Sequence, residues 1–418
     1  MTWITMQELA LRGKRVLIRE DLNVPIQADG SIADDHRIQA SLATLQKALQ
    51  QGARILVMSH LGRPIEGKFV PKFSLQVVAD RLTQLLGQPV PLVRDWVPTG
   101  NSASTIPSLA DGDLVLLENV RFNVGEKADD PSLGRSMASL CDIYVMDAFA
   151  SAHRAQASTH AVAQFAPTAC AGPLLVQETT ALDQAIRAPN RPVVTLIGGA
   201  KIGTKLGLLR RLLDQSDQLL VGGGIANTLL LASGVSVGKS LAEPDLVSEA
   251  QQLLRAAEEK GHPIPLPQDV VVTKELRNGS TTRLCAVSEI AADDIIADIG
   301  PQTCALYQKS LRSAQTIIWN GPFGVSEIPA FATGTKRIME MIAESQAYSL
   351  VGGGDTVAAL HREGLANQIS YISTGGGAFL TYLEGKTLPA IQVLEQRAAE
   401  NKRETNPSNG SPSEVFSS

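Results

Sequence analysis

Charged and polar side chains follow the apolar strands of the first half of the sequence, at the points where these strands should end. They are Asp21 and Asn23 after "RVLIR", His60 and Arg63 after "RILVMS", Asn119 and Arg121 after "DLVLLE", and Ser151, His153 and Arg154 after "DIYVMD", which itself ends in Asp147. Arg37 stands at the start of the first helix, behind the expected caps Asp34 and Asp35. Arginine binds phosphate or carboxylate through its planar fork. The pattern therefore predicts an anion site.

The ends of the strands in the second half are rich in glycine. "IGGAKIGTK" carries Lys201 and Lys205, and "VGGGIANT", "VGGGDTV" and "STGGGAF" each place three glycines after a strand. Glycine lets the backbone approach a ligand and point N–H groups at anionic oxygens, with a helix N-terminus behind. Asp355 could hold Mg²⁺, Thr356 could reach a phosphate and Glu327 could accept hydrogen bonds from a ribose. These features predict a nucleotide phosphate site.

Each of these features also has a purely structural interpretation. A single arginine can be a solvated surface charge or a partner of a helix cap, and each triple glycine can reflect tight packing between a strand and a helix. The histidines can contact a ligand or make structural hydrogen bonds. What favours binding is number: four arginines and two histidines fall at strand ends in one half, and three glycine turns accompany Lys201, Lys205 and Asp355 in the other.

Three familiar motifs are excluded. "SGVSVGKS" has Ser233 where a P-loop needs glycine and lacks a clear strand before it. "VGGGIAN" has Asn227 where a dinucleotide fingerprint has its third glycine. "GVSVG" (234–238) has the letters of a Gly-x-Ser-x-Gly elbow, but the same lack of a clear strand before it argues against an acyl-transfer triad.

The elements that must position these residues alternate regularly. Apolar runs at 15–19, 54–59, 113–118, 142–147, 192–198, 217–224, 316–322, 348–354 and 369–377 are separated by helical stretches. In the stretch at 37–52, Ile38, Leu42, Leu45 and Leu49 share one helical face, and Gly52 supplies a stop. Strands that are apolar throughout, separated by helices, indicate parallel sheets covered on both faces. The sequence therefore predicts an α/β protein with two doubly wound, Rossmann-like lobes.

The bulk properties limit the class of protein. A chain of 418 residues favours two domains, and its net charge of −5 gives no reason to expect nucleic-acid binding. The widely spaced Cys141, Cys170, Cys285 and Cys304 predict reduced, mostly buried thiols of a cytoplasmic protein. No apolar signal segment is seen at the N-terminus. The uncharged stretch 219–238 is long enough to span a bilayer, but its glycines favour a strand, a turn and a short helix.

The expected domain organisation follows from the same patterns. Residues 1–172 form the first lobe, 173–190 a helix joining the lobes and 191–372 the second lobe. Residues 401–418, rich in Ser, Asn, Pro and Glu, are expected to form a disordered tail.

The order of "IREDLNVP", "MSHLGRP", "LLENVRF", "DAFASAHRAQAST", "GGAKIGTK", "VGGGIANT", "WNGPFGV", "VGGGDTVAA" and "STGGGAFL" resembles the phosphoglycerate kinase family from about Leu11 to about Leu394. The resemblance implies reversible glycolytic phosphoryl transfer between 1,3-bisphosphoglycerate and ADP, giving 3-phosphoglycerate and MgATP. It implies a cytoplasmic monomer with a hinge, glycerate on the first lobe and nucleotide on the second. It also implies that residues 373–395 return to the first lobe, and that no nucleic acid or membrane is a partner.

The resemblance also assigns roles, position by position. The substrate-binding residues are Asp21, Asn23, Arg37, His60, Arg63, Arg121 and Arg154; the nucleotide-binding residues are Lys201, Lys205, Glu327, Gly353, Gly354, Asp355 and Thr356, with Asp355 on Mg²⁺; and Arg37, Lys201, Gly375 and Gly376 meet the transferring group. The sequence departs from the usual pattern at Glu20, Ala150, Gly203 and Ser326, where Val or Ala, Gly, Ser and a hydrophobic residue are commoner. Glu20 should point away from Asp21 on an extended strand end.

An acyl phosphate is already activated, so this chemistry needs alignment and charge neutralisation rather than a general base or a covalent intermediate. We expect direct in-line transfer after the hinge closes. Two rival hypotheses are another α/β phosphotransferase acting on a different carboxylate or sugar phosphate, and a scaffold protein descended from such an enzyme. A scaffold would be expected to have damaged motifs, yet Arg37, Lys201, Lys205 and Asp355 are all present.

Overall fold

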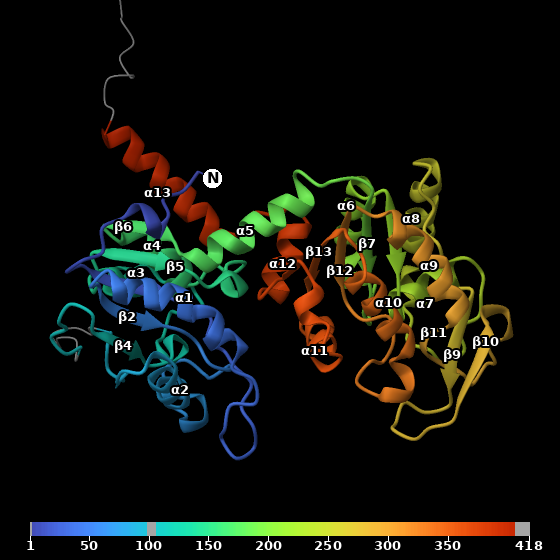
Figure 1. Cartoon of the computed structure of the whole chain (residues 1–418), viewed down its shortest axis with the longest axis horizontal. Coiled ribbons are helices and arrows are strands. Elements are labelled where there is room, and N and C mark those ends of the chain that lie inside the picture. The colour runs from blue at the N-terminus through green and yellow to red at the C-terminus, as the bar shows by residue number, and fades with distance from the viewer. Residues whose placement is uncertain (1, 98–105, 406–418) are drawn as a thin grey trace, which may run out of the picture. The chain divides into compact units, whose positions relative to one another are not determined.

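The computed structural model describes residues 2–97 and 106–405, which form two compact units (Figure 1). Unit 1 runs to Glu178 and resumes at Thr387, and unit 2 runs from Thr179 to Lys386. The first boundary therefore falls inside helix α5 (Pro173–Ile186), which ends before the predicted limit at 190. The return to unit 1 begins after helix α12 (Gly376–Leu383), later in the chain than the predicted 373.

Unit 1 is built on six parallel strands in the order β3-β4-β2-β1-β5-β6. They are β1 (Arg15–Arg19), β2 (Arg54–Met58), β3 (Leu92–Val93), β4 (Leu114–Leu117), β5 (Ile143–Met146) and β6 (Thr168–Ala171). In the register, Val16 of β1 lies opposite Ile55 on one side and Ile143 on the other. The strands are apolar along their length because helices cover both faces of the sheet.

The helices of unit 1 are α1 (His36–Gln50), α2 (Gln76–Leu86), α3 (Pro131–Ala138), α4 (Val162–Phe165) and α13 (Pro389–Thr405). From β1 the chain moves through β2 to β3 at the edge of the sheet, steps back to β4 and then crosses to β5 on the other side of β1. Since such crossovers are right-handed, the reversal puts α1 and α2 on one face and α3 on the other. Ile38 and Leu45 of α1 are buried in the core, as the helical spacing predicted.

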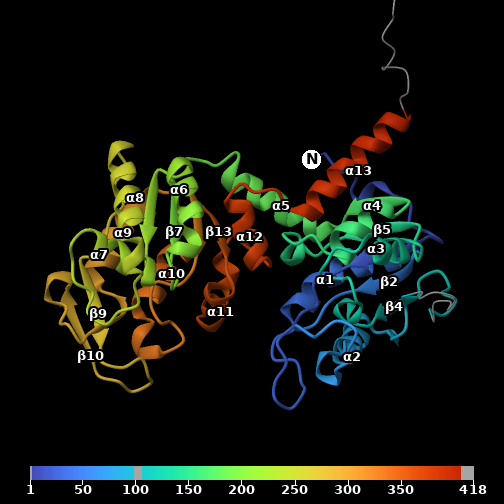
Figure 2. The same cartoon turned by 180° about the vertical axis from the view of Figure 1, so that it is seen from behind.

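Helix α13 corrects one prediction about the C-terminus. It lies beside α4 and β6 in both views (Figures 1 and 2) and continues to Thr405, so residues 401–405 are helical rather than part of a tail. No glycine or proline interrupts the sequence from Ala390 to Thr405, so nothing ends the helix at 401. Residues 406–418 of the predicted tail lie outside the described residues.

The first helix gives a second correction. Asp34 Oδ1 accepts a hydrogen bond from His36 N at 2.8 Å, whereas the side chain of Asp35 makes no capping bond. Asp35 instead accepts from Gln39 and forms an ion pair with Arg81 at 2.7 Å. Only one of the two predicted caps therefore bonds to the start of α1.

Unit 2 contains a second parallel sheet, of five strands in the order β14-β13-β12-β7-β8. Its strands are β7 (Val193–Ile197), β8 (Gln218–Val221), β12 (Thr316–Asn320), β13 (Tyr348–Gly352) and β14 (Tyr371–Ile372). Its other helices are α6 (Leu206–Gln215), α7 (Gly223–Ala232), α8 (Val247–Glu259), α9 (Pro301–Ser313), α10 (Thr333–Ala343) and α11 (Gly354–Arg362). The two doubly wound sheets confirm the predicted fold class.

Unit 2 also has an antiparallel sheet that the sequence analysis did not predict. It comprises β9 (Asp269–Thr273), β10 (Thr282–Ala286) and β11 (Ile295–Ile299), with β9 in the middle. In β10 only Cys285 is buried, so this strand lacks the apolar run by which the others were found.

Two predictions about apolar residues are confirmed. All four cysteines are buried and free. The uncharged stretch 219–238 forms β8, a glycine turn and α7. Over residues 2–97 and 106–405, no helix combines the length and the apolar character needed to cross a membrane.

Candidate functional site

In each unit, predicted binding residues follow the strands on either side of the point where the strand order of the sheet reverses, and others follow strands farther along the sheet, as Arg121 follows β4 and Asp355 follows β13. In unit 1 the reversal falls between β1 and β5, and in unit 2 it falls between β7 and β12. Loops that leave the carboxyl ends of such neighbouring strands diverge, and this opens a crevice where ligands of α/β proteins commonly bind. Each unit therefore has one candidate half-site at a position that its topology defines.

Asp21 is at the centre of the half-site in unit 1. Its Oδ1 accepts from Arg37 Nη1 at 2.8 Å, and its Oδ2 accepts from Ser151 Oγ at 3.1 Å, so the loops after β1 and β5 are joined here. Burial opposes ionisation of this carboxyl, but the nearby His60, Arg37 and Arg19 outweigh it and hold its pKa well below the ordinary value. Asp21 is therefore ionised, and it orients Arg37.

Asn23 and Arg121 are joined through the backbone of Gly62. Gly62 N donates to Asn23 Oδ1 at 2.8 Å, and Arg121 Nη1 donates to Gly62 O. Arg121 is only 5% exposed, and its Nε is buried but has no hydrogen-bond partner among the described residues. Burial lowers the pKa of Arg121 to about 10, and Arg154 and Arg19 add to this effect. The guanidinium is still charged at neutral pH, and its buried Nε–H is an unused donor.

His60 lies in the same cluster, in contact with an arginine that the sequence analysis did not select. His60 Nδ1 is 3.2 Å from Arg19 Nη2, and both side chains are buried. Burial lowers the pKa of His60 well below its ordinary value, and Arg19, Arg121 and Arg154 lower it further against the opposing effect of Asp21. His60 is therefore neutral at physiological pH.

The other two predicted residues of unit 1 are more open. Arg154 is half-buried, and its Nε donates to His153 Nε2 at 3.1 Å. Arg63 is exposed in the loop that follows β2. The structure thus gathers Asp21, Asn23, Arg37, His60, Arg121 and Arg154 around one crevice through shared contacts or mutual electrostatic effects, while nothing in the described contacts ties Arg63 to them.

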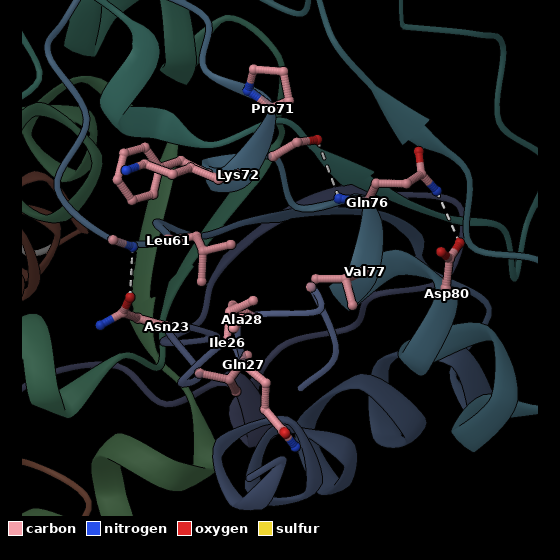
Figure 3. A pocket seen from close by; sticks show the side chains of 15 residues that line it. Asn23, Ile26, Gln27, Ala28, Leu61, Pro71, Lys72, Gln76, Val77 and Asp80 are labelled. Carbon is pink, nitrogen blue, oxygen red and sulfur yellow. Dashed lines mark hydrogen bonds between the residues drawn. The ribbon is translucent and has the colours of Figure 1, made fainter. Parts of the chain in front are cut away.

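A cavity of about 730 Å³ adjoins this half-site but differs from it in character. It shares Asn23 and Gly62 with the cluster, and apolar side chains such as Leu61 and Val77 point into it (Figure 3). The polar side chain of Gln76 is engaged with Asp80 at 2.9 Å, and Lys72 lies over the ring of Phe73. None of the clustered arginines lines this cavity, so the cavity and the arginine cluster are separate features of unit 1.

Lys205 occupies the reversal point of the sheet in unit 2. Its Nζ donates to Gly198 O at 2.7 Å and to Asn320 Oδ1 at 2.8 Å, and so it joins the ends of β7 and β12. Burial lowers the pKa of Lys205 to about 8, although Asp355 opposes the effect. Most of the lysine population is therefore charged at pH 7, at the point where an anionic ligand would meet the edge of the sheet.

The glycine turns of unit 2 differ in what surrounds them. A Cβ on Gly222 would lie 2.2 Å from the ring of Phe323, and one on Gly224 would lie 2.1 Å from Ala200 O. By contrast, a Cβ on Gly354 or Gly376 would have no neighbour within 4 Å. Packing thus explains the turn after β8, as the structural interpretation proposed. Among residues 2–97 and 106–405, no packing contact explains glycine at the starts of α11 and α12.

The remaining predicted residues of unit 2 surround these open glycines. Asp355 is exposed in the first turn of α11, and Gly353 has a φ of +102° that favours glycine. Thr356 is fully buried and its hydroxyl accepts from Gly321 N at 2.8 Å, so an approaching ligand would meet its backbone rather than its side chain. The N–H of Gly375 donates to Ser373 Oγ at 3.2 Å, whereas Gly376 begins α12.

Glu327 and Lys201 are exposed on loops at the same edge of the sheet. Ser326, beside Glu327, is buried and its carbonyl accepts from Arg362 Nη2 at 2.7 Å, so the loop after β12 is tied to the end of α11. Within the described ranges no three His, Cys, Asp or Glu residues form a metal-binding group. Asp355 alone still fits Mg²⁺, because this ion is often held by one carboxylate together with substrate phosphates.

Sequence reasoning missed the supports of both half-sites. Arg19 was taken as part of a strand, and Asn320 was taken as part of a strand end. A charged residue inside the otherwise apolar "RVLIR" could have signalled Arg19, because a buried cation needs partners. The departures are accommodated: Glu20 is buried beside Asp147, away from the Arg37 contact of Asp21, and a side chain on Gly203 would crowd Leu246.

Two doubly wound units, one with a cationic crevice and one with open glycine turns and a bridging lysine, define a two-lobed phosphotransferase. Residues 6–386 match the family model described as phosphoglycerate kinase. Curated relatives with that name include proteins of Nitratidesulfovibrio vulgaris (53% identical, covering 96% of this chain and 100% of the relative) and Legionella pneumophila (55%, covering 95% and 98%).

Solved structures agree with these relatives. The phosphoglycerate kinase of Coxiella burnetii is 51% identical with a TM-score of 0.87 and covers 95% of this chain and 100% of its own. That of Pyrococcus horikoshii is 30% identical with a TM-score of 0.82, with coverage of 95% and 99%. The chain belongs to the phosphoglycerate kinase family.

Proposed function

We propose a division of labour between the two units in the reaction of this family. The protein is a phosphotransferase with a carboxyl acceptor: it catalyses the reversible glycolytic transfer of a phosphoryl group between 1,3-bisphosphoglycerate and ADP, which yields 3-phosphoglycerate and ATP. We assign the three-carbon ligand to unit 1 and the nucleotide to unit 2. The main support is the buried, unpartnered Nε of Arg121 in a crevice of charged arginines, because such a donor calls for an anionic acceptor.

In unit 1 the proposed ligand-binding residues act as charged donors around an orienting acid. They are Asp21, Asn23, Arg37, His60, Arg63, Arg121 and Arg154. Asp21 is engaged by Arg37 and Ser151, so it holds donors in place more than it contacts an anion. Arginine forks are well suited to the phosphate and carboxylate of the three-carbon ligand.

In unit 2 the proposed nucleotide-binding residues are Lys201, Lys205, Glu327, Gly353, Gly354, Asp355 and Thr356. Asp355 would hold Mg²⁺, which neutralises phosphate charge when bound. The open space at Gly354 lets phosphate oxygens approach the N-terminus of α11, where backbone N–H groups are unpaired within the helix.

The transfer needs no general base, because the two oxygens that exchange the phosphoryl group, on the carboxylate of 3-phosphoglycerate and on the terminal phosphate of ADP, are already ionised. Arg37 and Lys201 would neutralise charge on the moving phosphoryl group, and the backbone at Gly375 and Gly376 would add N–H donors at the start of α12. Lys205 stays protonated at neutral pH and adds positive charge on the nucleotide side. This set of groups supports direct in-line transfer.

Because the two sets of residues belong to different units, transfer requires a hinge motion that brings both ligands together. We propose that the protein works as a cytoplasmic monomer, with neither nucleic acid nor membrane as a partner. Small-angle scattering tests the hinge: the radius of gyration should fall when 3-phosphoglycerate and MgATP are both present, and an unchanged value with saturating ligands would contradict closure.

The assignment of ligands is tested by calorimetry on Arg121→Met. Methionine retains much of the packing of the arginine stem but removes every donor, so affinity for 3-phosphoglycerate should fall by about tenfold or more. Affinity for MgADP should be unchanged. Arg54→Met is the matched control. Arg54 begins β2 and pairs with Asp111 at the amino ends of the strands of the same sheet, opposite the half-site. Loss of MgADP affinity in Arg121→Met with intact 3-phosphoglycerate binding would reverse the assignment.

A further inference from the structure

One buried arginine of unit 1 has no part in the transfer described above. Arg19 ends β1 and is 0% exposed, and all three of its guanidinium nitrogens are engaged. Nε donates to Ser158 Oγ at 3.1 Å, Nη1 donates to the carbonyl of Glu20, and Nη2 lies 3.2 Å from His60 Nδ1. A buried guanidinium is tolerated only when its donors are satisfied, so these contacts fix its orientation.

The chemistry of these groups also fixes the direction of each hydrogen bond. A guanidinium has donors and no acceptor, so Ser158 Oγ and His60 Nδ1 must both accept from Arg19. The hydroxyl proton of Ser158 then points to Glu126 Oε1 at 2.5 Å, and Ser158 N donates to Glu126 Oε2 at 2.9 Å. Glu126 is itself fully buried. A directed chain therefore runs from the Glu126 carboxylate through Ser158 and Arg19 to His60.

The position of Ser158 depends on an unusual piece of backbone. It lies in the π-helical turn η5 (Ala157–Ala161), and its carbonyl accepts from Tyr144 Oη at 3.0 Å. Asp129 holds the far end of the same turn, accepting from Ala161 N at 3.0 Å. Short π-helical segments often occur at functional sites, and here the turn brings a hydroxyl to the guanidinium.

The consequence falls on His60. Because Nδ1 accepts a hydrogen bond, the single proton of the neutral ring must lie on Nε2. Burial disfavours a second proton on the ring, and so do the charges of Arg19, Arg121 and Arg154. Asp21 is the acid that opposes this effect. Nε2 makes no hydrogen bond within the described part of the chain, so its N–H is available to a ligand.

We propose that Arg19 is a positioning residue that holds His60 as the Nε2–H tautomer, so that His60 offers one N–H donor to an oxygen of the three-carbon substrate. The alternative tautomer would present a lone pair to that oxygen and repel it. The identity of the ligand rests on the function proposed above, whereas the tautomer follows from the geometry of unit 1 alone.

The tautomer is tested without any ligand by NMR of protein labelled with ¹⁵N-histidine. The His60 signals are assigned by their loss in His60→Gln. Between pH 5.5 and 8.5, Nδ1 should have the chemical shift of an unprotonated ring nitrogen and Nε2 that of an N–H. An N–H at Nδ1, or titration at the ordinary pKa of histidine, would overturn the proposal.

Arg19→Lys then tests the cause. Lysine keeps the positive charge but carries its donors on a single nitrogen, which cannot reach all three acceptors around the guanidinium, so His60 should populate both tautomers. KM for 3-phosphoglycerate should rise about tenfold, with kcat and the KM for MgATP little changed. Ser158→Ala, which keeps the cation and removes its Nε acceptor, should give a smaller change in the same direction. Arg15→Lys at the other end of β1 is the control and should leave the His60 spectrum unchanged.

These experiments separate the two proposals. If Arg19→Lys and Ser158→Ala fold and the His60 spectrum stays that of the parent protein, Arg19 does not set the tautomer. If the tautomer is as proposed but 3-phosphoglycerate leaves the Nε2 signal unmoved, the positioning role of Arg19 is supported and the assignment of His60 to the substrate is wrong.

Discussion

The two units use different groups to bind an anion at the carboxyl ends of the strands of a parallel sheet. Unit 1 uses side chains: arginines are brought together, and Asp21 and the Glu126–Ser158 pair orient them. Unit 2 uses mainly backbone: glycines at the starts of α11 and α12 leave open space, and Lys205 is a half-buried cation at the same edge. Because both sets lie at a reversal of strand order, topology fixes where each half-site forms.

The difference has consequences for robustness. A site made of side-chain charge depends on groups whose protonation and orientation are set by neighbours, so one substitution changes several others. A site made of open backbone depends on the absence of side chains, and it tolerates changes elsewhere but not a new Cβ. Substitutions that remove charge should therefore damage unit 1 most, and substitutions that add volume should damage unit 2 most.

Among substitutions that remove charge from unit 1, Arg37→Ala should have the largest effect on activity. We expect kcat to fall by about 10²–10³-fold, by analogy with the loss of one preorganised donor, while the KM for MgATP changes little. Steady-state kinetics with both substrates varied will measure this. Arg54→Ala, which removes a comparable ion pair with Asp111, should retain nearly full activity. An equal loss of kcat and nucleotide affinity in Arg37→Ala would show that Arg37 acts only on the fold or on general binding.

Gly354→Val tests whether nucleotide binding needs the open space at the start of α11. The added side chain meets no neighbouring protein atom at its Cβ, so the thermal midpoint should hold while the KM for MgATP rises about tenfold. Gly222→Ala is the control with the opposite expected result, because its Cβ would collide with Phe323. Overpacking of this kind costs about 1–3 kcal/mol, so that variant should lose stability. Unchanged nucleotide kinetics in Gly354→Val would remove the argument for phosphate approach at α11.

Glu20→Gln tests the pair of buried carboxyl groups, Glu20 and Asp147, next to the half-site of unit 1. Burial raises the pKa of Asp147 to about 6, and burial and Asp147 raise that of Glu20 well above its usual value. A carboxyl whose pKa is raised in the folded state binds its proton more tightly there than in the unfolded chain, so stability should fall as pH rises from about 4 through 6 and beyond.

The amide has no such charge, so Glu20→Gln should flatten this dependence and raise the thermal midpoint of unit 1 at pH 8 by roughly 5 °C. Differential scanning calorimetry from pH 5 to pH 8 will measure it. Glu118→Gln is a useful contrast, since Glu118 is a buried carboxyl that accepts from Ser74 Oγ and Leu75 N and should be destabilised by the change. A pH dependence that is identical in Glu20→Gln and the parent would mean that Glu20 does not bind its proton more tightly in the folded state.

The sequence determined the local elements and their class. The strand at 15–19, the apolar face of the helix at 36–50 and the strand, turn and helix at 219–238 follow from periodicity and burial over a few residues. It also supplied the types of residue that bind anions. In the antiparallel sheet β10 is mostly exposed and has no apolar run, whereas the apolar run of β9 was overlooked. The helix through 401–405 was missed because composition was given more weight than the absence of a helix breaker.

Tertiary structure decided which residues meet. Arg19 contacts Ser158 at a separation of 139 residues, and Glu20 lies beside Asp147, because β1 and β5 are neighbours across the reversal of the sheet. The glycine triplets after β8 and β13 look alike in sequence, yet Gly222 is crowded and Gly354 is open. The physical reason is that local pattern depends on spacing along the chain, whereas partners, burial and protonation depend on strand order, which a single sequence does not state residue by residue.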